Sequence, residues 1–150
     1  MKAPGVDAAG REQLLIQIGV QQRLFSREQV EDARRASPGA PLGEALVARG
    51  VISREQARGL ERAVQYRLGR DEDKRVAQIV VDSGYCPENR VQEALRRQKD
   101  IYAKSGELIR LGTLLTDDGS LTDSQHIAAF KIFRIERAGL HPGTLDSRGS

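Results

Sequence analysis

The sequence has 150 residues, of which 39% are hydrophobic, 4% are aromatic and 30% are charged. This length suits one domain with an ordinary core, and the scarcity of aromatic side chains favours packed helices over a β-sandwich. A single cysteine excludes an internal disulfide and indicates a reducing, cytoplasmic setting. No apolar stretch approaches the roughly 18 residues of a membrane-spanning helix, so we expect no membrane insertion.

The net charge of +3 is small because basic and acidic residues are interleaved. The run from Arg70 to Arg75 alternates in sign, which predicts a solvated surface with salt bridges rather than a basic stripe for nucleic acid. Binding of nucleic acid would depend on Arg96, Arg97 and Lys99. We rank that function below the others, and nucleic acid is not expected as a partner.

In chain order, we expect a flexible N-terminus over residues 1–10, a helical-repeat domain over residues 11–138 and a flexible tail over residues 139–150. The domain contains four copies of one pattern, in which a short helix ends at a glycine and a capped helix follows. The copies lie at about residues 14–37, 41–69, 74–104 and 108–138. The expected fold is therefore all-α, with short helix–turn–helix hairpins packed into one compact domain.

The second copy shows the pattern most plainly. Leu42 opens a short apolar-faced helix, and Gly50 falls where that helix should end. Ser53 is then predicted to be the N-cap of a second helix, and Gln56 three residues later would complete a capping box. The first copy is the weakest, because Arg23 stands in its glycine position.

The later copies vary the pattern. In the third, Gly84 is followed by Cys86, which stands where apolar residues stand elsewhere and is expected to be buried rather than nucleophilic. Residues 67–69 just before this copy are expected to end the preceding helix. In the fourth copy, His126 takes the position of Ala57 and is expected on the helix surface.

The side chains that catalysis usually requires are scarce. Two histidines and one cysteine give no zinc-site spacing, and the chain has no Walker-type phosphate-binding loop. We therefore expect a protein that is not an enzyme and that needs no metal and no cofactor.

The fourth copy carries a longer motif that matches the second at a constant offset of 69 residues. Its positions are Arg110, Leu111, Gly112, Leu115 and Gly119. This motif resembles the MshEN domain, found at the N-terminus of type II secretion and type IV pilus assembly ATPases and in other bacterial regulatory proteins. The resemblance covers roughly residues 40–135, with Pro41 in place of the arginine in the second copy.

Ligand-binding members of that family hold cyclic di-GMP between two tandem copies. The resemblance implies that the Arg110 motif forms half of such a site, with Arg75 and Gln98 contributed by the neighbouring copy. Backbone N–H groups at a helix start and an adjacent arginine suit a phosphate.

Two functions remain open from the sequence. The chain is either a bacterial regulatory module that senses cyclic di-GMP or a ligand-free helical scaffold for protein–protein interaction. A scaffold would need the same leucine, glycine and capping residues simply to build its hairpins. A protein partner is expected, and a homodimer is one possible form of the assembly.

Overall fold

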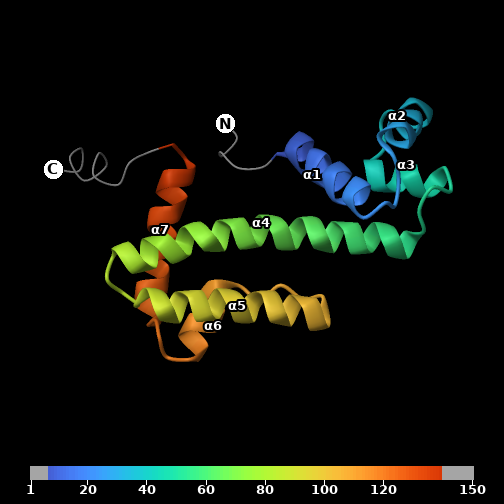
Figure 1. Cartoon of the computed structure of the whole chain (residues 1–150). Coiled ribbons are helices and arrows are strands. Elements are labelled where there is room, and N and C mark those ends of the chain that lie inside the picture. Colours follow the sequence, from blue (N-terminus) through green and yellow to red (C-terminus); the bar gives the residue numbers. More distant parts are fainter. Residues whose placement is uncertain (1–6, 140–150) are drawn as a thin grey trace. The chain divides into compact units, whose positions relative to one another are not determined.

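The computed structural model describes residues 7–139, and within that range the chain is all-helical, as the sequence predicts (Figure 1). The helices are α1 (Ala8–Gln21), α2 (Arg27–Ala36), α3 (Leu42–Ala48), α4 (Arg54–Asp82), α5 (Glu88–Ser105), α6 (Leu111–Asp117) and α7 (Asp123–Arg137). They gather into two compact units that divide between residues 67 and 68. We call residues 7–67 the N-terminal unit and residues 68–139 the C-terminal unit; α4 contributes to both.

The chain turns between helices at the positions that the sequence marks. Gly50, Gly84 and Gly119 have φ angles of 74°, 76° and 79°, in the left-handed region that glycine adopts without steric cost. Arg23 has a φ angle of 60° at the corresponding position of the first copy. A side chain in that region costs about 1–2 kcal/mol, which agrees with the weaker match of this copy to the pattern.

Capping boxes fix the starts of three helices. At α4, the Gln56 N–H donates to Ser53 Oγ at 3.0 Å and the Ser53 N–H donates to Gln56 Oε1 at 2.9 Å. Ser26 and Thr122 cap α2 and α7 in the same way. The predicted capping box at Ser53 is therefore confirmed, and it satisfies N–H groups that a helix start leaves without intrahelical partners.

The expectation that residues 67–69 end a helix is wrong. They lie inside α4, which runs unbroken for 29 residues. Gly69 is buried, and a Cβ at this position would lie only 2.5 Å from Cδ2 of Leu108. This glycine therefore permits close packing instead of terminating a helix.

The ends of the chain are only partly described. Asp7 is the N-cap of α1 and its side chain accepts from the Gly10 N–H at 2.9 Å, so residues 8–10 of the predicted flexible N-terminus are helical. The predictions for residues 1–6 and 140–150 lie outside the described residues. No helix within residues 7–139 is long and apolar enough to cross a membrane.

Each unit has its own buried apolar residues. Leu42, Leu46 and Leu60 are 4% exposed or less in the N-terminal unit. In the C-terminal unit, one cluster joins α4, α5, α6 and α7 and includes Leu111, Leu115 and Cys86. Cys86 is thus a buried apolar residue, as predicted.

Candidate functional site

The structure brings together some of the predicted site residues and separates others. Arg110, Leu111 and Gln98 all bond to one side chain that the sequence did not single out, Asp73 of α4. Arg75 pairs elsewhere, and Gly119 serves as a turn.

The Asp73 carboxylate is 2% exposed and lies at the start of α6. It accepts from the Leu111 backbone N–H at 2.9 Å. The Arg110 guanidinium donates to both oxygens, from Nη2 at 2.9 Å and from Nε at 3.1–3.2 Å. The same Nη2 also lies 3.0 Å from Oε1 of Glu72.

Gln98 completes this junction from α5 and is fully buried. Its Nε2 donates to Asp73 Oδ2 at 2.7 Å and to the Ile109 carbonyl at 2.9 Å. Its Oε1 accepts from Arg70, which also donates to the Leu95 carbonyl at 2.8 Å. All the polar atoms of the Gln98 amide are therefore used within the C-terminal unit.

Both carboxylates of this junction are paired with arginine. Hydrogen bonding to Asp73 is the main cause that raises the pKa of Arg110 above its ordinary value. Glu72 also pairs with Arg137 at 2.7 Å. A buried carboxylate is tolerated only when it is paired and hydrogen-bonded, and Asp73 meets both conditions.

The remaining motif residues have packing or turn roles. Leu111 and Leu115 are completely buried in the core of the C-terminal unit. Gly112 lies beneath the imidazole of His126, so closely that a Cβ would stand 2.0 Å from Nε2. His126 is half-buried rather than fully on the surface.

Arg75 does not reach this junction. Its guanidinium forms a two-point pair with Glu136 of α7, from Nε at 2.7 Å and from Nη2 at 2.8 Å. That bond is the main cause that raises the pKa of Arg75. About half of its side chain is exposed, so this is a surface ion pair.

Sequence reasoning missed Asp73 because it placed the whole run from Arg70 to Arg75 on a solvated surface. The helical register holds the missed signal. Gly69, Asp73, Val76 and Val80 follow an i, i+4, i+7, i+11 spacing and are all buried. A carboxylate on an otherwise apolar stripe needs a partner, and Arg110 provides it.

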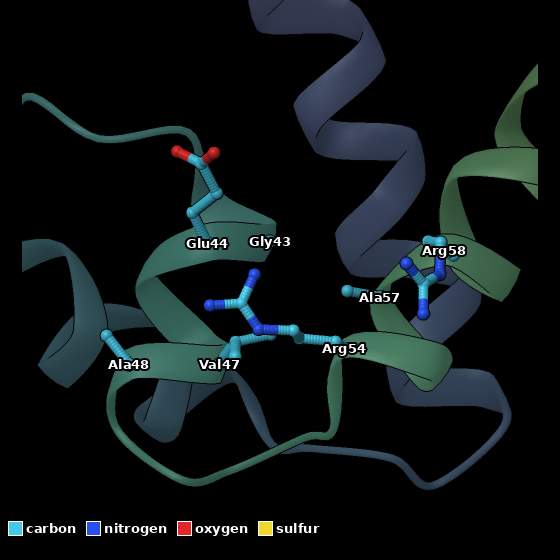
Figure 2. Close-up of a pocket in the computed structure, with 7 residues that line it drawn as sticks. All are labelled: Gly43, Glu44, Val47, Ala48, Arg54, Ala57 and Arg58. Carbon is cyan, nitrogen blue, oxygen red and sulfur yellow. The ribbon is translucent and has the colours of Figure 1, made fainter.

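The second copy forms a different surface. A groove of about 350 Å³ lies between α3 and the start of α4, lined by Gly43, Glu44, Val47, Ala48, Arg54, Ala57 and Arg58 (Figure 2). We call this the α3–α4 groove. Apart from its chain neighbours and the backbone of its own helix, no atom lies within 4 Å of where a Cβ would stand at Gly43. The glycine is thus left uncovered here, unlike Gly112.

Two cations line the α3–α4 groove. Figure 2 shows the Arg54 side chain extending from the start of α4 toward α3 and the Glu44 carboxylate pointing away from it. Neither Arg54 nor Arg58 forms an ion pair or a side-chain hydrogen bond within residues 7–139. Sequence reasoning did not identify this groove, because a groove between two helices depends on how those helices pack.

The basic residues considered for nucleic acid are partly neutralised. Arg96 pairs with Glu93, and Arg97 lies 3.3 Å from Asp118. Two of the three basic residues are thus paired with carboxylates, and Lys99 forms no ion pair within residues 7–139.

Comparison with known proteins returned no match among family models, curated proteins or solved structures. The geometry of the chain itself must therefore support any functional proposal.

Proposed function

We propose that this chain is a non-catalytic adaptor module that binds a protein partner, and that its Arg110 motif is structural rather than a receptor for cyclic di-GMP. The observation that carries the proposal is the position of Asp73. Its carboxylate bonds to the Leu111 N–H and to the Arg110 guanidinium, the two groups that would hold a phosphate.

A phosphate entering this position would have to displace a buried carboxylate that makes bonds to three residues. It would also leave Asp73 buried with a second anion beside it, which is strongly unfavourable. Arg75 is turned to Glu136 and offers no second contact. The hypothesis of a helical scaffold requires none of these rearrangements.

The test is calorimetric titration of the full chain with cyclic di-GMP, with GTP as the control nucleotide. We expect no heat of binding from either nucleotide. Micromolar binding of cyclic di-GMP that is absent for GTP, and that is lost in Arg110→Ala, would overturn the proposal and identify a second-messenger receptor.

A further inference from the structure

We propose that the α3–α4 groove is the docking site for an acidic segment of the partner protein, which places an aromatic side chain over Gly43. This inference rests on the proposed function and names the chemistry of the partner. It follows from the room in the groove, from the side chain that fills the equivalent groove elsewhere in the chain, and from the charges around it.

The room in the groove comes from two small residues. Gly43 has no side chain, and Ala57 faces it from α4 (Figure 2). Val47 and Ala48 add apolar side chains to the lining. A concave surface with an apolar floor and a few polar groups at its rim is the usual form of a binding pocket.

The fourth copy shows what kind of group fits such a groove. Gly112 and His126 stand at the positions of Gly43 and Ala57, at the same offset of 69 residues. There, the imidazole lies directly on the glycine and meets the Phe130 ring edge-on, with 6.0 Å between ring centroids. A planar ring is therefore the group that this chain itself places in the groove. In the second copy, Ala57 leaves this position open, so a ring from the partner can occupy it.

The charges favour an acidic partner. Arg54 and Arg58 line the groove with Glu44 as the one carboxylate, and both guanidinium groups lack a partner within the described chain. In two other grooves the lining arginine is engaged within the chain, although Lys74 in the second of them has no ion pair within residues 7–139. In the groove between α1, α3 and α4, Arg11 pairs with Glu61 at 3.9 Å, and in the groove between α4 and α5, Arg70 bonds to Leu95 and Gln98.

Unpaired arginines beside an apolar floor suit carboxylates that flank an aromatic residue. Arginine forms bidentate bonds with carboxylates and also stacks on aromatic rings. Aromatic side chains in small pockets commonly dominate the energetics of protein interfaces. The proposed segment therefore combines one aromatic residue with Asp or Glu on either side.

The experiment is selection of a phage-displayed random peptide library on the immobilised full chain, followed by fluorescence polarisation with the selected peptides. We expect enrichment of peptides that contain an aromatic residue next to Asp or Glu. Enrichment of basic peptides, of peptides without an aromatic residue, or of no peptide would overturn the inference.

Variants then locate the binding site. Ala57→His, which places in this groove the ring that the fourth copy carries, should weaken peptide binding by about tenfold or more. Arg54→Glu combined with Arg58→Glu should have an effect at least as large. Arg27→Glu is the matched control, because Arg27 follows Ser26 as Arg54 follows Ser53 but lines no described groove.

Circular dichroism establishes whether each variant is folded. If Ala57→His does not fold, the arginine variants still test the inference. Unchanged affinity in folded groove variants would overturn it. Cyclic di-GMP binding that is lost in Ala57→His would also overturn it, in favour of a nucleotide. If no peptide is selected and no nucleotide binds, only this inference is wrong. If a nucleotide binds and its binding depends on Arg110, the proposed function is wrong.

Discussion

The second and fourth copies share a Leu-Gly helix start, a glycine turn and a capped helix, but they expose different chemistry. In the fourth copy, the helix start is closed by Asp73 from outside the hairpin and by His126 from within it. In the second copy, Pro41 replaces the arginine and Ala57 replaces the histidine. The shared residues therefore build the hairpin, whereas the residues that vary decide whether its surface is closed or open.

One position extends the contrast. Arg58 in the second copy corresponds to Ile127 in the fourth, a residue that is 65% exposed. The open groove thus has a cation at its rim, while the closed one has an apolar side chain in that place. A partner that recognises the second copy by its charge would therefore not bind the same surface of the fourth copy.

The largest expected effect is the loss of stability that Asp73→Ala causes at the fourth copy. It leaves the Leu111 N–H and the Gln98 amide without their acceptor, so the free energy of unfolding should fall by about 3–5 kcal/mol in urea denaturation. Asp71→Ala, on the exposed side of the same turn, is the matched control and should stay near the parent value. Acetate should partly restore the melting temperature of Asp73→Ala and leave the parent unchanged. Equal stability of the two variants would contradict the assigned role of Asp73.

A smaller effect should separate the two glycines. Gly112→Ala pushes the His126 ring from its place and should lower the free energy of unfolding by about 1–3 kcal/mol, because a packed site resists added volume. Gly43→Ala meets open space and gains helix propensity, so it should be neutral or slightly stabilising. Thermal unfolding of both variants, and of Gly112→Ala combined with His126→Ala, provides the measurement. If the second substitution does not restore stability, the contact between His126 and Gly112 is not the cause.

The local features of the fold could be predicted from the sequence, and the tertiary contacts could not. The turn at Gly50 and the cap at Ser53 follow from short-range backbone chemistry, which a few neighbouring residues determine. The bond from Leu111 to Asp73 joins residues 38 positions apart. The candidate residues Arg110 and Gln98 were therefore located near a real polar junction, but its acceptor and the separate pairing of Arg75 required the structure.

A still smaller effect is expected for Arg75→Ala. Its pair with Glu136 is solvent-exposed, so the free energy of unfolding should fall by less than about 1 kcal/mol, and added salt should reduce the difference. Arg110→Ala should cost more, because it removes the counter-ion of a buried carboxylate. Urea denaturation at low and high ionic strength compares the two. Equal losses with equal salt dependence would mean that the two arginines have similar environments.

The smallest expected effect is a change in the labelling rate of Cys86, which reports on the core around the fourth copy. Burial raises the pKa of its thiol, and the side chain belongs to the same core as Leu111, so native labelling with a maleimide near neutral pH should be slow. Gly112→Ala should increase the labelling rate, and Gly43→Ala should not. An equal increase in both variants would show that the two hairpins do not respond separately.

The unbroken α4 has a consequence for how such a chain can change over evolution. Its first part carries the capped helix of the second sequence copy, and its last part carries the opening helix of the third. No loop separates the two, so adding or removing one of these copies at its boundary would alter α4 itself. The structural unit that such a change must keep intact is therefore longer than the pattern that repeats in the sequence.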